Sequence, residues 1–377
     1  MNNKKLKDEV LINFNNSNYL KAIELCENIN DFNLLEFKKE ILIFSNFKLD
    51  YFLKTIEIIN EFYKEKELYK KEKILHILSL CYLNTKDFNN CISVCNKILI
   101  INSENDFIYN IIGVAYSELK EFDNSNRFYI KCLNKNPKNL EARYNYGLNF
   151  FHLENFDDSE KQFENIILLN RNFKNSMLML GIIKSKLNKN DEAINIFTDL
   201  IKINENNGEI YFNLGIVHQN MKNYMKSNKY LNKAIELNYN KHECLNSIGI
   251  NYQKLRNYDE AKNLFQQSIN LNKGYRKAHN NLGILLQKSG HFKSALKNYN
   301  KALKLNNNHA LTLFNKSICL LEMGNYEEGI ELYKWRQNGK FSSNKFLDLK
   351  NIKNKTILIT CDQGLGDTIL FSRLLIL

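Results

Sequence analysis

The sequence of 377 residues contains a single proline and only fourteen glycines. An all-β sandwich or barrel needs a turn about every 8–12 residues, and such turns depend on these two residue types. The same scarcity excludes collagen-like and proline-rich extended chains. Hydrophobic residues make up 44% of the chain and charged residues 25%, the balance of a folded protein. We therefore expect a mostly helical fold.

Long apolar runs and paired cysteines are also missing. No stretch of about 18 apolar residues is present, and no apolar segment follows the N-terminus, so neither a membrane span nor a secretory signal is predicted. The eight cysteines form no C-x-x-C pair, and no second pair completes a zinc site with Cys91 and Cys95. We expect reduced thiols that serve as core residues, no metal, no cofactor and a cytoplasmic location.

Arginine is scarce as well, although the chain is basic. The net charge of +12 suggests an anionic partner such as nucleic acid. However, seven arginines stand against 46 lysines, and arginine is the residue that clamps phosphates and reads bases. About sixty asparagines accompany the lysines, and both residue types have AT-rich codons, so gene composition could also explain the charge. Nucleic-acid binding is therefore disfavoured.

What the sequence does contain is an internal repeat. Glycines recur at intervals of 34 residues: Gly113, Gly147, Gly181, Gly215, Gly249 and Gly283. A small residue follows each glycine twelve positions later, and a large apolar residue follows four positions after that. The blocks are 72–105, 106–139, 140–173, 174–207, 208–241, 242–275 and 276–309, without insertion or deletion. A fixed period of this length indicates a repeat architecture.

Each block predicts two helices. In 208–241, apolar and small residues follow helical spacing from Tyr211 to His218, break at Asn223-Tyr224, and resume from Leu231. The polar residue at this junction suits a helix cap, and we expect the aromatic residue to pack under the turn. The glycine is expected where the two helices of a repeat cross most closely, since a β-carbon would hold them apart.

These features resemble the tetratricopeptide repeat (TPR) family, whose 34-residue repeats carry Gly, Tyr, Ala, Phe and Pro at positions 8, 11, 20, 24 and 32. Block 106–139 supplies Gly113, Tyr116, Ser125, Tyr129 and Pro137 there. The resemblance implies an all-α superhelical solenoid of antiparallel helix pairs, with a groove lined by first helices, that binds protein or peptide. We expect degenerate repeats over 1–71, seven repeats over 72–309, a partial eighth over 310–338 and a linker over 339–354.

Position 6 of the first helix is asparagine in four repeats: Asn145, Asn213, Asn281 and Asn315. Position 5 is asparagine in three: Asn110, Asn246 and Asn280. Asparagine is a poor residue for a helix interior, and its amide can both donate to and accept from a peptide backbone. The TPR arm of protein O-GlcNAc transferases carries an asparagine ladder at position 6, and similarity to it implies a peptide-binding groove here. The alternative is a solvated face that an asparagine-rich sequence fills by chance.

The last segment, 355–377, differs in character. Residues 355–361 form a short β-branched run that predicts a buried strand, and a glycine turn follows before a helix that Asp367-Thr368 can cap. A strand, a glycine loop and a helix in this order form the start of a Rossmann-like unit. The N-terminus of such a helix favours the binding of an anion. A dinucleotide fingerprint is incomplete, because Ile369 replaces the third glycine.

This segment is similar to the start of a heptosyltransferase-like glycosyltransferase domain of the GT-B fold in bacterial TPR fusions. The similarity rests on Tyr333, Trp335-Arg336, residues 363–368 and Arg373. It implies that Asp367 is the general base of sugar transfer and that Gly364, Gly366 and Thr368 form the adjoining phosphate or acceptor loop. A carboxylate at a helix N-terminus is stabilised as the anion. The alternative is that Asp367 only caps the helix.

The sequence thus predicts a protein- or peptide-binding TPR module, the N-terminal arm of a glycosyltransferase that uses a nucleotide-sugar donor. The donor-binding half of a GT-B enzyme would lie after Leu377, so we expect this chain alone to transfer no sugar. A pure scaffold for protein–protein interaction, with a vestigial tail, is the alternative. A basic solenoid associated with RNA is a third possibility that the low arginine content disfavours.

Overall fold

The computed structural model describes residues 3–337, except residues 30, 65–67, 69–70 and 174. In this part of the chain there are 20 α-helices and two short 3-10 helices, and no strand. The prediction of an all-α TPR-type fold built from helix pairs is confirmed. The strand and helix predicted over 355–377 lie outside the described residues.

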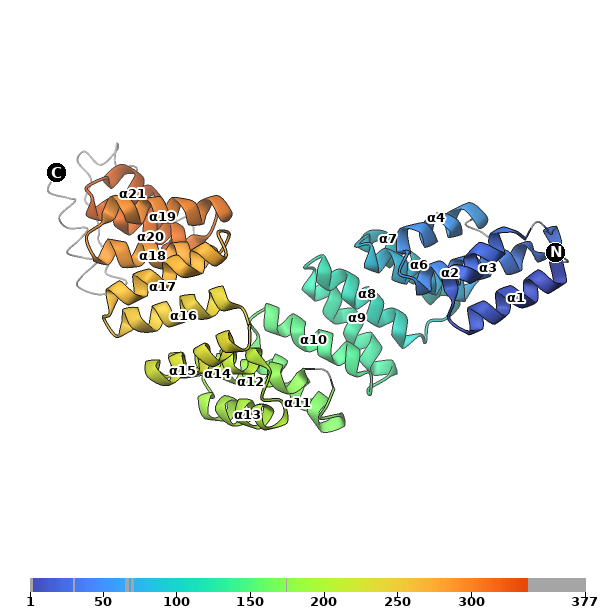
Figure 1. The fold of residues 1–377 in the computed structure, drawn as a ribbon, viewed down its shortest axis with the longest axis horizontal. Coiled ribbons are helices and arrows are strands. Elements are labelled where there is room, and N and C mark those ends of the chain that lie inside the picture. The colour runs from blue at the N-terminus through green and yellow to red at the C-terminus, as the bar shows by residue number, and fades with distance from the viewer. Residues whose placement is uncertain (1–2, 30, 65–67, 69–70, 174, 338–377) are drawn as a thin grey trace, which may run out of the picture. The chain divides into compact units, whose positions relative to one another are not determined.

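The chain divides into two compact units, Met1–Leu255 (unit 1) and Arg256–Leu377 (unit 2). Sequence reasoning did not anticipate this boundary, which falls between the two helices of block 242–275. Unit 1 contains, in chain order (Figure 1), α1 (Asn3–Asn15), α2 (Tyr19–Glu27), η1 (Phe32–Leu34), α3 (Leu35–Lys48), α4 (Phe52–Phe62), α6 (Glu72–Asn84), α7 (Phe88–Ile101), α8 (Asp106–Glu118), α9 (Phe122–Lys135), α10 (Leu140–His152), α11 (Phe156–Leu169), α12 (Ser176–Lys186), α13 (Asn190–Ile203), α14 (Gly208–Asn220), α15 (Tyr224–Glu236) and α16 (Lys241–Lys254).

Unit 2 contains α17 (Tyr258–Leu271), α18 (Arg276–Lys288), α19 (Phe292–Leu305), α20 (Ala310–Glu322), α21 (Tyr326–Tyr333) and η2 (Lys334–Gln337). Within it, α18 packs on α19, α19 on α20, and α20 on α21. The short η2 also contacts α20, and the Arg336 guanidinium lies 5.5 Å from the ring centre of buried Tyr333. The Tyr333–Arg336 segment that suggested a fused enzyme therefore packs on the last repeat.

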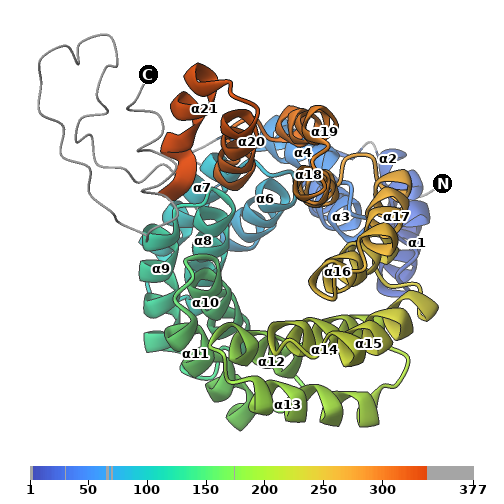
Figure 2. The same cartoon turned by 90° about the vertical axis from the view of Figure 1, so that its left-hand side faces the viewer.

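In unit 1 the first helices of neighbouring repeats contact one another, as α6 does with α8, and α8 with α10. Figure 2 shows α8, α10 and α12 on the inside of the curve of unit 1, and α9, α11 and α13 on its outside. Side chains that remain accessible on first helices therefore face the inner side of this unit. This arrangement matches the expectation for an inner face lined by first helices.

Five of the six predicted glycines, Gly113, Gly147, Gly181, Gly215 and Gly283, lie where the two helices of their repeat approach closely, as predicted. A β-carbon built on Gly113 would lie 2.5 Å from Cε1 of Tyr129, and one built on Gly181 would lie 2.6 Å from Cε1 of Phe197. Neither distance is tolerable for real carbon atoms. The opposing helix also bonds there, since the Ser125 hydroxyl donates to the Gly113 carbonyl at 2.6 Å. Only glycine lets the two helices approach closely enough to bury these aromatic rings.

The turn inside each helix pair contains one residue in the left-handed region. At most of the turns this residue is not glycine: Ser17, Asp50, Lys86, Lys120, Glu154, Asn188, Lys222 and Arg256 all have φ near 60°. Gly290 and Gly324 take the same place in unit 2. Because Ser17 and Asp50 share this turn, the helix pairs α1–α2 and α3–α4 have the local geometry of the later repeats.

The predicted caps at the junctions are only partly correct. The side chains of Asp87, Asn155 and Asn257 accept hydrogen bonds from backbone N–H groups of the following helix. Glu121 and Asn223 make no such bond at the start of α9 and α15. At those junctions the turn itself, rather than the side chain of the first polar residue, ends one helix and starts the next.

Two kinds of polar cluster are buried between repeats of unit 1, a hydrogen-bonded amide cluster that occurs twice and an ion cluster. The Asn149 amide donates to Ser125 Oγ at 2.8 Å, and the Asn251 amide donates to Ser227 Oγ at the same distance. In the ion cluster, Lys184 Nζ lies 2.6 Å from a carboxylate oxygen of Glu160. Lys184 also pairs with Glu164 and Glu192, and Glu160 pairs with Lys189. Each cluster links α-helices of successive repeats.

Candidate binding face on the first helices

The accessible surface of the first helices contains a row of branched aliphatic residues. Position 9 of each block is half-buried and aliphatic in eight consecutive repeats: Leu80, Val114, Leu148, Ile182, Ile216 and Ile250 in unit 1, and Ile284 and Ile318 in unit 2. Position 9 follows position 6 by three residues, so both lie on the same face of the helix. Sequence reasoning missed this aliphatic row, although its 34-residue spacing is visible in the sequence.

The position-6 asparagines of unit 1 lie on this face but are not adjacent. Asn145 on α10 and Asn213 on α14 are both half-buried, and Met179 of α12 occupies the same position between them. The Asn213 amide donates to the Glu209 carbonyl of its own helix at 2.9 Å, which leaves its side-chain oxygen available. Asn145 makes no side-chain hydrogen bond with any other described residue. The predicted ladder therefore has a gap in unit 1.

In unit 2 the position-6 asparagines fall in consecutive repeats, Asn281 on α18 and Asn315 on α20. The Asn315 amide donates to Oδ1 of the buried Asn280 at 3.1 Å, so side-chain amides of neighbouring repeats are hydrogen-bonded to each other. Both Asn281 and Asn315 are half-buried. The half-buried Ile284 and Ile318 follow them one helical turn later.

The position-5 asparagines are oriented toward the protein interior. Asn246 is 4% exposed and Asn280 5% exposed. Asn110 is half-buried, and its Oδ1 is shielded from solvent without a hydrogen-bond partner among the described residues. Position 5 therefore supports the packing of neighbouring repeats, and position 6 supplies the accessible amide.

The residue before Asn145, Tyr144, has aromatic and acidic neighbours. The ring of Tyr144 lies edge-on to Phe163, with 5.2 Å between ring centres. Burial, together with the carboxylates of Glu209 and Glu141, raises the pKa of the Tyr144 hydroxyl above its usual value. The Tyr144 hydroxyl thus remains protonated and can act as a hydrogen-bond donor.

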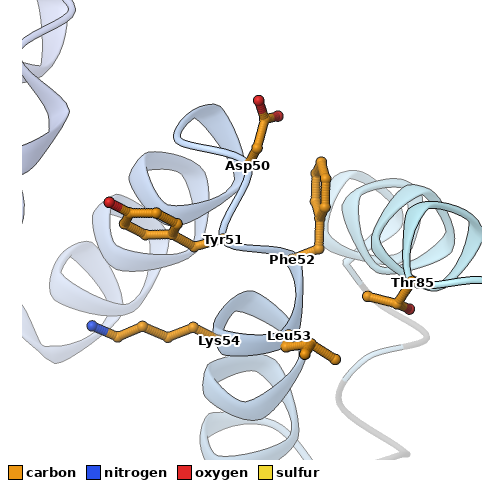
Figure 3. A pocket seen from close by; sticks show the side chains of 6 residues that line it. All are labelled: Asp50, Tyr51, Phe52, Leu53, Lys54 and Thr85. Carbon is orange, nitrogen blue, oxygen red and sulfur yellow. The ribbon is translucent and has the colours of Figure 1, made fainter.

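A separate hollow of about 430 Å³ lies at the turn between α3 and α4 (Figure 3). Asp50, Tyr51, Phe52, Leu53, Lys54 and Thr85 line it. Leu53 is 68% exposed and Tyr51 47% exposed, so the hollow is open and mainly apolar. Figure 3 shows Tyr51 and Lys54 pointing away from Thr85. The lining side chains do not converge on a common point, as those of a catalytic site would.

The described residues supply no group of three or more histidine, cysteine, aspartate or glutamate side chains suited to a metal ion. The seven described cysteines are buried and unpaired, as predicted for core residues. Burial raises the pKa of the Cys81 and Cys132 thiols to about 12, the opposite of what a nucleophile requires. No helix in the described part of the chain is long and apolar enough to cross a membrane.

The predicted residues of the C-terminal segment cannot be placed. Asp367, Gly364, Gly366 and Thr368 lie outside the described residues. The general base and the adjoining loop therefore remain predictions from sequence resemblance.

Comparison with known proteins supports the repeat assignment. Residues 108–139, 175–207, 208–274 and 277–309 match the tetratricopeptide repeat family. A search of curated proteins gave no significant match.

Solved structures share the fold at low sequence identity. A tetratricopeptide repeat protein from Parabacteroides merdae aligns with a TM-score of 0.62 and 12% identity, covering 67% of this chain and 99% of that one. The APC/C hetero-tetramer Cut9–Hcn1 aligns with a TM-score of 0.51 and 14% identity, covering 80% of this chain. This chain spans only 58% of that protein's length. The four matched stretches are therefore tetratricopeptide repeats.

Proposed function

We propose that the chain binds an extended segment of a partner polypeptide along the first-helix face of its repeats. The observation that carries this proposal is the pairing of an accessible amide at position 6 with an aliphatic residue at position 9, one helical turn away. The pair occurs twice in unit 2, as Asn281 with Ile284 and Asn315 with Ile318. In unit 1 it occurs as Asn145 with Leu148 and Asn213 with Ile216.

The chemistry of this pair suits an extended backbone. A carboxamide donates through its nitrogen and accepts through its oxygen, so it can bond both groups of a peptide unit. The aliphatic residue beside it offers apolar contact to a side chain of the bound segment. Recognition of this kind depends on the backbone and on side-chain size, and tolerates different sequences.

The relatives agree with a binding role without establishing it. The Cut9–Hcn1 structure is a hetero-tetramer in which a protein of similar fold assembles with a different chain. That property belongs to the relative, and 14% identity supports the fold only. A pure scaffold for protein partners therefore fits the repeats of this chain without any enzymatic activity.

The narrower proposal, that the repeats form the arm of a glycosyltransferase, rests on residues 333–336 and 363–373 of the sequence. Asp367 would then remove the proton from the acceptor hydroxyl. If so, Asp367→Asn should abolish sugar transfer by the intact transferase, because the amide cannot act as a general base. Unchanged sugar transfer by this variant would contradict the role of Asp367.

Peptide binding can be tested without a known partner. Selection of random peptides displayed on phage against the purified chain should yield ligands, whose affinities are then measured by titration. Methylation of single backbone nitrogens in a selected peptide removes donors while keeping every side chain. We expect at least one such methylation to weaken binding roughly 2- to 12-fold, the effect of one lost hydrogen bond. Binding that is insensitive to every methylation would exclude recognition of the backbone.

A further inference from the structure

Unit 2 contains a long segment without a single acidic residue. Residues 261–321 include ten lysines and arginines and no aspartate or glutamate. The rest of the chain mixes both signs of charge, so a local excess of this size distinguishes the surface of α18, α19 and α20. The local positive potential does not depend on the charge of the chain as a whole.

Four of these residues form a lysine stripe along α19, made of Lys293, Lys297, Lys301 and Lys304. Steps of three or four residues place them on one face of the helix, about 4.5–6 Å apart along its axis. All four side chains are exposed. The opposite face of α19 is buried through Ala295, Tyr299 and Ala302, so the stripe points away from the core of unit 2.

The stripe has no countercharge in the described part of the chain. None of its four lysines pairs with a carboxylate, whereas Lys316 of the same unit lies 2.8 Å from Glu328. Like charges one helical turn apart repel each other and destabilise a helix. Helix α19 therefore carries an unfavourable charge arrangement that an anionic ligand would relieve.

The same face is hollowed. A depression of about 470 Å³ is lined by the four lysines together with Leu296 and Asn300. Leu296 is half-buried and lies between Lys293 and Lys297 in the sequence of the helix. The surface thus offers a small apolar contact surrounded by ammonium groups, with one amide for a hydrogen bond.

We propose that this face of α19 binds an acidic segment of a partner protein, separately from the first-helix face. Carboxylates one helical turn apart on an acidic helix would match the spacing of the lysine stripe. An apolar side chain between them would contact Leu296. Electrostatic attraction would select this partner, whereas the asparagines of the first-helix face are uncharged.

Other anionic ligands fit this surface less well. Single-stranded nucleic acid is held by basic residues together with aromatic stacking platforms. Both aromatic residues of α19 are withdrawn from this surface, since Tyr299 is fully buried and Phe292 half-buried. Membrane-binding helices expose large apolar side chains beside their lysines. Leu296 is partly buried between the lysines and cannot insert into a bilayer.

The test compares two variants of the full chain with equal charge. In the stripe variant, Lys293, Lys297, Lys301 and Lys304 are changed to glutamine; in the control variant, Lys262, Lys273, Lys277 and Lys288 are changed in the same way. All eight lysines are exposed residues of unit 2, and glutamine has nearly the helix propensity of lysine, so circular dichroism should be unchanged. The probe is a labelled helical peptide with glutamate at every fourth position and a leucine row beside it.

Fluorescence anisotropy should show that the probe binds the wild-type chain and the control variant, and that binding weakens as salt is added. The stripe variant should bind roughly 10- to 500-fold more weakly, the sum of four exposed charge pairs. Equal affinities of the two variants, or no binding of the probe to wild type, would overturn the proposal. Tighter stripe-dependent binding of oligouridylate, or of vesicles containing phosphatidylserine, would overturn it in favour of those ligands.

Discussion

The side-chain amide of Asn251 donates to the hydroxyl of Ser227 across the boundary between two successive repeats, at 2.8 Å. Asn251 is fully buried, and its oxygen accepts a hydrogen bond from the Gln219 side chain at 2.6 Å. Asn149 and Ser125 form the same pair three repeats earlier. These amides connect a first helix to the preceding repeat, so they fix how neighbouring repeats of unit 1 stack.

Changing Asn251 to alanine should lower the free energy of unfolding by about 1–3 kcal/mol, because the buried hydroxyl of Ser227 and the amide of Gln219 each lose a hydrogen bond. Urea denaturation followed by circular dichroism measures this change. Asn165→Ala on the exposed face of α11 is the matched control and should have almost no effect. Equal effects of the two substitutions would mean that the buried bonds contribute nothing to stacking.

Glycine at the helix crossing can be tested in unit 2. Gly283→Ala would place a β-carbon 2.6 Å from Cε1 of Tyr299, whose ring is buried and whose hydroxyl donates to Gln287. Although alanine favours helices, this overpacking should make the protein about 1–2 kcal/mol less stable. Gly274→Ala meets only Asn272 Oδ1 at 3.4 Å and should be tolerated. A stabilised Gly283→Ala variant in thermal denaturation would refute the crossing argument.

Replacing a left-handed turn residue by glycine should make the protein more stable. Lys120 has φ of 63°, a conformation that costs a residue with a β-carbon about 1–2 kcal/mol. Glycine avoids this cost but loses more chain entropy, about 0.5–1 kcal/mol, so Lys120→Gly should stabilise the protein by up to about 1 kcal/mol. Lys120→Val should destabilise it, since a β-branched residue fits this region worst. A lower melting temperature for Lys120→Gly than for Lys120→Val would contradict the assignment.

The buried ion cluster predicts a pH dependence. Burial would raise the pKa of Glu160, but hydrogen bonds from Lys184 and Lys189 outweigh it and hold the pKa below its ordinary value of 4.5. A carboxylate with a lowered folded-state pKa stabilises the protein above its unfolded pKa, and this stability is lost as the pH falls through the folded value. Glu160→Gln should therefore cost about 1–3 kcal/mol near neutral pH.

The difference in unfolding free energy between Glu160→Gln and wild type should shrink as the pH falls from the ordinary carboxyl value of 4.5 through the lowered pKa of Glu160 in the folded protein. Denaturation series at several pH values would measure it. Glu164→Gln is the control, because this carboxylate is exposed and pairs only with Lys184 in the cluster. A pH-independent difference for Glu160→Gln would show that the charge of Glu160 does not stabilise the repeats.

The helix pairs could be predicted from sequence because their steric requirements leave a local pattern. Gly113 and Tyr129 must occur at a fixed spacing for one helix to cross the other, and that spacing repeats. The sequence contains no comparable pattern for the buried amides of Asn149 and Asn251, because an asparagine in a helical segment can be either exposed or buried. Whether it finds a partner depends on the distance to the preceding repeat.

The candidate site was predictable in position but not in geometry. Helical spacing placed Asn281 and Asn315 on the face of the first helices, whereas the bond from Asn315 to Asn280 depends on how two repeats stack. The sequence shows that Met179 occupies position 6 between Asn145 and Asn213, but only the structure shows that this position lies on the accessible face of unit 1. Nothing in the sequence distinguishes Lys293 and Lys297 from other exposed lysines, because the hollow beside Leu296 depends on the packed structure.

The most direct measurement of the central claim is the affinity of a selected peptide for the Asn281→Ala, Asn315→Ala double variant, determined by calorimetric titration beside wild type. If the amides hold the peptide backbone, two lost hydrogen bonds should weaken binding roughly 5- to 150-fold while the helical content stays unchanged. The Asn263→Ala, Asn270→Ala variant, altered at exposed positions of α17, should bind like wild type. An unchanged affinity of the Asn281→Ala, Asn315→Ala variant for every peptide that binds unit 2 would contradict the claim.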